Sequence, residues 1–211
     1  MNWSLLGKRA DTMRFALERL PESPTIVETG CVRTADNWQG DGMSTVVFAE
    51  WVDAHGGNLY SVDIDRDNVA QADALTSWSR QVLVVLGDSV PFLANFEQPI
   101  DLLYLDSLDY PDGALRDLYG GRDDIHRAMV LLDAMGEDEI VARHGTLILP
   151  SQEHCARELD AAMPWLDDRS VVVIDDAALP GGGKARLARK ILEREGWRCA
   201  LDAYQTVWVR A

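Results

Sequence analysis

Five acidic residues could do chemistry, because each stands where an apolar, strand-like run of the sequence ends: Glu28, Asp63, Asp88, Asp106 and Asp175. Gly30 follows the first of them closely, and Gly87 directly precedes the third. Glycine lets backbone approach a ligand, and a carboxylate can accept hydrogen bonds from both hydroxyls of a diol. Each acid alone could cap the helix that follows it, but five in succession favour a binding site for a nucleotide-like ligand.

The elements that must position these acids alternate along the chain. Apolar runs predict five strands, and amphipathic stretches between them predict helices. This alternation predicts a parallel sheet with helices on both faces, which binds ligands at the carboxyl ends of its strands. The predicted strands are 25–32, 58–64, 81–86, 100–105 and 170–174, and the predicted helices are 3–20, 43–54, 67–78, 151–166 and 184–195.

The C-terminal segment does not continue the alternation of strands and helices. Two further apolar runs, 197–201 and 205–210, are joined by only three residues, which is too short for a crossover helix. These strands must therefore be antiparallel. We predict a single-domain, Rossmann-like α/β fold with a mostly parallel seven-stranded sheet and a C-terminal antiparallel hairpin. Residues 111–150 exceed an ordinary connection and are expected to form a lid or a subunit interface.

Composition excludes several functions. A chain of 211 residues with 47% apolar residues can bury one core, and no apolar run approaches the roughly 20 residues needed to span a bilayer. The net charge of −15 argues against a nucleic-acid partner. Three widely separated cysteines indicate reduced thiols and a cytoplasmic protein. The expected partner is a small molecule, and a homodimer is possible.

The order and spacing of five motifs resemble the class I S-adenosylmethionine-dependent methyltransferases: ETG (28–30), GMST (42–45), SVDID (61–65), LGDS (86–89) and LYLD (103–106). The C-terminal hairpin resembles that class too. Within it, the chain is similar to the small-molecule O-methyltransferases of the catechol and macrocin types and to the related cephalosporin-hydroxylase group. The resemblance implies methyl transfer from S-adenosylmethionine to a hydroxyl. Alternatives are a hydroxylase-like enzyme or a non-catalytic cofactor-binding relative.

The resemblance also implies roles in cofactor binding. Asp63 would accept both ribose hydroxyls, whereas Asp65 is better explained as a helix cap. The other implied contacts are with the methionine portion, from Glu28, Gly30, Gly42 and Ser44, and with the adenine, from Gly87, Asp88 and Ser89.

A second group of acids, Asp106, Asp175 and Asp176, ends two adjacent predicted strands. Carboxylates that converge from two strands suit Mg²⁺, with Ca²⁺ or Mn²⁺ as alternatives. In the catechol-type enzymes an equivalent trio holds Mg²⁺, which lowers the pKa of the substrate hydroxyl. Alternatively, Asp175 and Asp176 cap the following loop and Asp106 is a lone acid of the site.

The sequence departs from these relatives in two places. Gly30 and Gly42 are twelve residues apart, so the extra loop, with Arg33 and Trp38, is expected at the mouth of the pocket. Asp109 stands where relatives carry a lysine or a histidine, so Asp109 could be the general base or a fourth metal ligand. The histidines, chiefly His154, are the other candidate bases. The run Gly181–Lys184 is interpreted as a loop leading into the last helix, whose basic residues form a solvated face.

Overall fold

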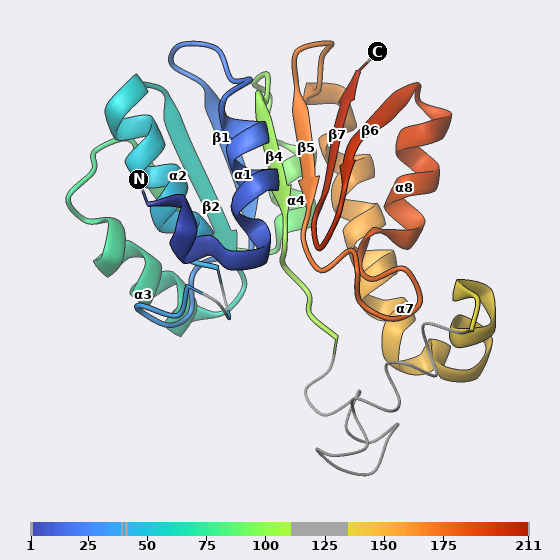
Figure 1. The fold of residues 1–211 in the computed structure, drawn as a ribbon. Helices are drawn as coiled ribbons and strands as arrows, with labels where there is room; N and C mark the ends of the chain where they lie inside the picture. The colour runs from blue at the N-terminus through green and yellow to red at the C-terminus, as the bar shows by residue number, and fades with distance from the viewer. Residues whose placement is uncertain (1, 39, 41, 111–134, 211) are drawn as a thin grey trace.

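A seven-stranded sheet with the order β3-β2-β1-β4-β5-β7-β6 organises the protein (Figure 1). The computed structural model describes residues 2–38, 40, 42–110 and 135–210. The five strands from β3 to β5 run parallel, and β7 lies antiparallel to both β5 and β6, which confirms the predicted fold. The strands are β1 (Thr25–Thr29), β2 (Asn58–Asp63), β3 (Val82–Leu86), β4 (Leu102–Leu105), β5 (Val171–Ile174), β6 (Trp197–Asp202) and β7 (Thr206–Arg210).

Helices cover both faces of the sheet, as alternation of strands and helices requires. On one face pack η1 (Trp3–Arg9), α1 (Ala10–Leu17), α2 (Ser44–His55) and α3 (Arg66–Thr76). On the other pack α4 (Ser89–Ala94), α7 (Glu137–Ala162) and α8 (Ala185–Arg194), while η2 (Met163–Trp165) continues α7. The central strands β4 and β5 are buried along their whole length, because both of their faces are covered.

Several boundaries differ from the sequence prediction. Strand β1 ends at Thr29 rather than at residue 32, because Gly30 turns the chain with a φ of +87°. The helix predicted from residue 151 begins at Glu137 and continues through Pro150, whose fixed φ suits a helix although its missing N–H costs one hydrogen bond. The leading helix is interrupted at Gly7, and the short α4 was not predicted.

The last part of the segment expected to form a lid or an interface, residues 137–150, is thus the beginning of α7. Residues 111–134 lie outside the described part of the chain, so that expectation stays a prediction. Among the described helices, none combines the length and the apolar character needed to cross a membrane.

Candidate functional site

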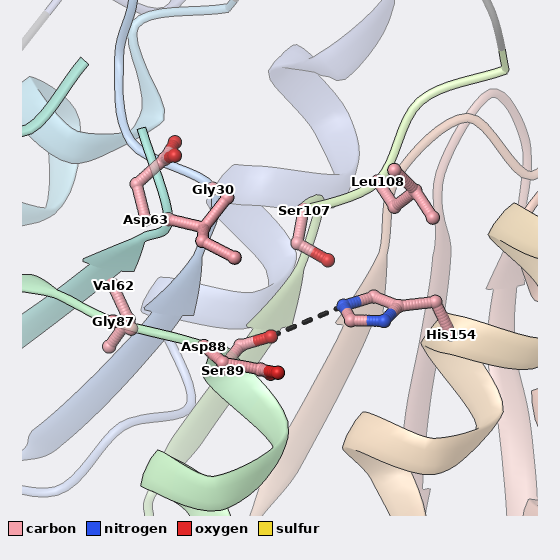
Figure 2. Close-up of a pocket in the computed structure, with 10 residues that line it drawn as sticks. Gly30, Val62, Asp63, Gly87, Asp88, Ser89, Ser107, Leu108 and His154 are labelled. Atoms are coloured by element: carbon pink, nitrogen blue, oxygen red, sulfur yellow. Dashed lines mark hydrogen bonds between the residues drawn. The ribbon is translucent and has the colours of Figure 1, made fainter. Parts of the chain in front are cut away.

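Two adjoining pockets lie at the carboxyl ends of the parallel strands, and both are lined by Gly30, Asp63, Ile64 and Ser107. The first extends towards β3 and α4, and its remaining lining residues are Val62, Gly87, Asp88, Ser89, Leu108 and His154 (Figure 2). The second extends towards α2 and β4 and adds Cys31, Arg33, Ser44, Asp65, Asn68 and Asp106. Together they form one groove across the end of the sheet.

Asp63 stands where the two pockets meet, as predicted. One oxygen, Oδ2, accepts hydrogen bonds from the Cys31 backbone N–H at 3.0 Å and from the Asn68 amide at 3.1 Å. The other, Oδ1, accepts from the Asp65 backbone N–H at 2.8 Å. Asp65 itself caps α3, as expected. The Asp63 carboxylate is thus held in one orientation, and Oδ1 keeps a lone pair for a ligand, whereas both lone pairs of Oδ2 accept hydrogen bonds from the protein.

Gly30 is required by the close approach of β1 to β4. A Cβ at this position would lie 2.5 Å from the Asp106 carbonyl oxygen, and the φ of +87° disfavours any side chain. Without a side chain here, both pockets stay open beside Asp63 and Ser107.

Glu28 does not border the groove, which corrects the sequence prediction. Its side chain is fully buried on the face of β1 beneath α2, and it accepts hydrogen bonds from the hydroxyls of Ser44, Thr45 and Ser61. Burial raises its pKa to about 7, although these three hydroxyls favour the ionised form. Glu28 therefore links the start of α2 to the sheet through hydrogen bonds. Of Glu28 and its three hydroxyl partners, only Ser44 lines the second pocket.

Gly42 is likewise not among the pocket-lining residues. A Cβ on Gly42 would lie 3.0 Å from the Arg9 side chain, and its φ is +79°. Met43, also with a positive φ, precedes the first residue of α2. The glycine thus serves the turn into α2 and its contact with Arg9, because the long loop shifts the turn away from the groove.

On the opposite side of the first pocket, His154 of α7 faces Ser89 at 3.3 Å (Figure 2). A buried carboxylate, Glu158, lies one turn further along α7 and accepts a hydrogen bond from the Ser89 hydroxyl. Its Oε1 is 3.3 Å from His154 Nε2, and this hydrogen bond raises the pKa of His154. Asp88 lines the pocket and caps α4, accepting from the Val90 N–H at 3.0 Å.

The predicted metal-binding trio is wrong in one member. Asp175 is fully buried, and its Oδ2 accepts a hydrogen bond from Arg9 Nε at 2.9 Å. Asp176, in the turn after β5, lies instead beside Lys184, with its Oδ2 3.4 Å from Nζ, so the carboxylates of Asp175 and Asp176 point to different partners and do not converge. The carboxylates that do converge belong to Asp106, Asp109 and Asp176, with one oxygen of each within 4.8 Å of the others.

A lysine ammonium lies among these three carboxylates. Lys184 Nζ is 2.6 Å from Asp106 Oδ1, 2.6 Å from Asp109 Oδ1 and 3.4 Å from Asp176 Oδ2. Its side chain is 2% exposed, so the expectation that it belongs to a solvated helix face is wrong. Because the oxygens that a Mg²⁺ ion would need are taken by a resident cation, this donor set does not fit Mg²⁺.

Of Asp106, Asp109 and His154, only Asp106 lines the second pocket. Burial raises the pKa of Asp106 well above its usual range. The positive charge of Lys184 lowers this pKa, and the neighbouring carboxylates raise it further. Asp109 is held by Lys184 and by Arg33 at 2.7 Å; burial opposes its ionisation, but Lys184 lowers its pKa. His154 lines the first pocket instead, beside Glu158.

Sequence reasoning missed Arg9, Glu158 and the position of Lys184. Arg9 is buried; burial lowers its pKa, but the Asp175 carboxylate raises it further. Nothing in its sequence context distinguishes Arg9 from the other basic residues of the leading helix. The run of three glycines before Lys184 was the available signal, because such a run brings backbone and the next side chain into a confined place.

Comparison with known proteins concerns the fold. Residues 39–132 match a family model described as a methyltransferase domain. No curated protein matches the chain significantly.

Solved structures share the fold at low sequence identity. The O-methyltransferase NovP matches with a TM-score of 0.59 and 12% identity, over 97% of this chain and 80% of that one. The S-adenosylhomocysteine-bound methyltransferase PaMTH1 of Podospora anserina matches with a TM-score of 0.58 and 12% identity, over 96% and 77%. A putative rRNA-methylase of Clostridium thermocellum matches with a TM-score of 0.57 and 12% identity, over 95% of both chains. These likenesses confirm the resemblance to class I methyltransferases in fold.

Proposed function

Since this chain has the class I methyltransferase fold and carries a methyltransferase-domain match, we propose that it transfers a methyl group from S-adenosylmethionine to a hydroxyl of a small molecule. The observation that carries the proposal is the continuous groove through Gly30 and Asp63, with the Asp106 carboxylate at one end. Magnesium is not part of the proposal, because Lys184 takes the oxygens that would bind it.

The two pockets suit the two halves of the cofactor. The first combines the apolar Val62, Ile64 and Leu108 with polar groups at one edge, which suits an adenine ring. Asp63, at the junction, suits the ribose diol, because Oδ1 has a free lone pair and Oδ2 can accept from a second hydroxyl in place of the Asn68 amide. The second pocket is lined by charged and polar groups, among them Arg33 and Asp106, which suits an amino-acid zwitterion.

Asp106 is the group that we assign to proton transfer. Its Oδ1 is held by Lys184 at 2.6 Å, and within the described residues its Oδ2 accepts no hydrogen bond. In the proposed reaction the acceptor oxygen attacks the methyl carbon, the carbon–sulfur bond breaks, and its electron pair stays on sulfur. The hydroxyl proton passes to Oδ2 of Asp106, which then releases it to solvent.

The charge of the protein supports a small acceptor. A net charge of −15 disfavours a polyanion such as RNA, although one of the structurally similar proteins is a putative rRNA-methylase. The acceptor is therefore proposed to be a small, uncharged or cationic hydroxyl compound. A homodimer and a cytoplasmic location remain part of the proposal.

Binding of S-adenosylhomocysteine is the direct test. Titration calorimetry is expected to show one site for S-adenosylhomocysteine and none for NAD⁺. Asp63→Asn should weaken the affinity by about 10- to 100-fold, since a hydrogen bond to a charged group contributes roughly 1.5–3 kcal/mol. Asp67→Asn, which changes an exposed carboxylate on α3, is the matched control and should bind normally. Absence of binding to the unmodified protein would contradict the proposal.

A further inference from the structure

The Lys184 ammonium lies among the carboxylates of Asp106, Asp109 and Asp176, which we call the acidic cluster. It can do so because the loop before Lys184 has a conformation that only glycine adopts readily. Gly181, Gly182 and Gly183 all have positive φ angles, and a Cβ on Gly183 would lie 1.9 Å from the Asp176 carbonyl oxygen. The loop is also fixed from outside, since Gln152 Nε2 of α7 donates to the carbonyls of Gly181 at 2.9 Å and Gly183 at 3.0 Å. The position of the ammonium is therefore part of the fold, and not one of several side-chain rotamers.

The Lys184 ammonium has as many N–H donors as it has carboxylate neighbours. It has three N–H donors and no acceptor, and it faces three carboxylates that come from the end of β4, the loop after it and the loop after β5. Burial of an ammonium lowers its pKa, but Asp106, Asp176 and Asp109 raise the pKa of Lys184 well above its usual value. The three carboxylates thus favour the charged form of Lys184.

A divalent ion and this ammonium exclude one another. The three oxygens lie within 4.8 Å of each other, so the space between them holds one cation. A Mg²⁺ ion in the same place would lie within contact distance of a buried positive charge, which is strongly unfavourable at low dielectric. Asp106 is the member of the cluster that lines the groove, so whatever fixes the cluster also fixes Asp106.

We propose that Lys184 is a built-in cation that takes the place of a divalent metal ion, so that the site holds Asp106 in position without any metal. Lys184 is then a positioning residue, because it is buried and acts on the groove through Asp106. Its link to methyl transfer rests on the function proposed above, but the exclusion of metal does not and can be measured separately.

Removal of the lysine should therefore create a metal site. Mn²⁺, followed by its electron paramagnetic resonance signal and by calorimetry, is the probe. Metal-free protein with Lys184 intact is expected to bind no Mn²⁺ at this cluster. Lys184→Met should gain one stoichiometric Mn²⁺ site, and adding Asp176→Asn to that variant should abolish the gain.

Three controls make the result decisive. Lys190→Met removes an exposed lysine of α8 and should leave Mn²⁺ binding unchanged. Lys184→Arg keeps a cation in place and should bind no Mn²⁺. Calorimetry with S-adenosylhomocysteine on the same samples reports on the proposed function independently.

The proposal is overturned if folded Lys184→Met gains no Mn²⁺ site. Should that variant fail to fold, as thermal unfolding would reveal, the unmodified protein decides the matter. Tight, stoichiometric Mn²⁺ binding that is lost in Asp176→Asn would then overturn the proposal, and its absence would support it.

Discussion

Replacement of Asp106 by asparagine is expected to lower the turnover of methyl transfer by about 10²- to 10⁴-fold, the usual contribution of a general base. The amide keeps the size of the side chain, but it cannot take up the proton of the acceptor hydroxyl. Lys184 remains held by Asp109 and Asp176, so the variant should fold. Turnover is to be measured as S-adenosylhomocysteine release, once an acceptor has been identified by screening hydroxyl compounds.

The same variant separates catalysis from binding. Its affinity for S-adenosylhomocysteine should stay within a few-fold of the unmodified protein, because Asp63 and Gly30 are untouched. Since burial raises the pKa of Asp106, the unmodified enzyme should lose activity as the pH falls through that raised pKa, and Asp106→Asn should lack this acidic limb. Asp73→Asn, on the exposed side of α3, is the matched control. Equal turnover of Asp106→Asn and the unmodified enzyme would rule out this role.

The second large predicted effect is a pH dependence of the free energy of unfolding, and its cause is the Glu28 carboxyl group. Its pKa is about 7 in the folded protein against 4.5 for an ordinary glutamate, so the folded state holds a proton that the unfolded chain releases. The stabilisation is complete below the unfolded pKa and is lost as the pH rises through about 7. Between pH 5 and pH 8 the folded state should lose about 2–3 kcal/mol through this group, at roughly 1.4 kcal/mol per pKa unit.

Glu28→Gln removes this dependence, because the amide carries no charge. Its oxygen can still accept from the hydroxyls of Thr45 and Ser61, and its NH₂ group can donate to the hydroxyl of Ser44. Relative to the unmodified protein, the variant should therefore gain about 2–3 kcal/mol between pH 5 and pH 8. Urea unfolding at both pH values measures this difference. Glu50→Gln, on the exposed side of α2, should show no such change. A difference between Glu28→Gln and the unmodified protein that is the same at both pH values would contradict the assignment.

Sequence alone was sufficient for the architecture, because local patterns determine it. The apolar period of the strands, the length of the connections and the three-residue turn at 202–204 together required a parallel sheet with a reversed last strand. The same reasoning placed Gly30, Asp63, Asp88 and Asp106 at one edge of the sheet, and these residues line the groove. Parallel strands bring their carboxyl ends together whatever the details of packing.

Side-chain direction and partners were decided by the tertiary structure. Glu28 follows an apolar run as Asp63 does, but it lies on the face of β1 that α2 covers, so it binds three hydroxyls in the core. Asp175 and Asp176 are neighbours in sequence, yet one pairs with Arg9, 166 positions away, and the other with Lys184.

The cluster of Asp106, Asp109 and Asp176 shows most clearly what the sequence could not predict. Converging carboxylates could be predicted as a cation site from the strand ends, because the charge on them requires a positive partner. Which cation satisfies that requirement depends on the glycine loop at 181–183 and on Gln152 of α7, which bring Lys184 across the fold. The sequence determined that negative charge would gather beside the groove, and only the packing of distant segments decided that a lysine, rather than a metal ion, lies within it.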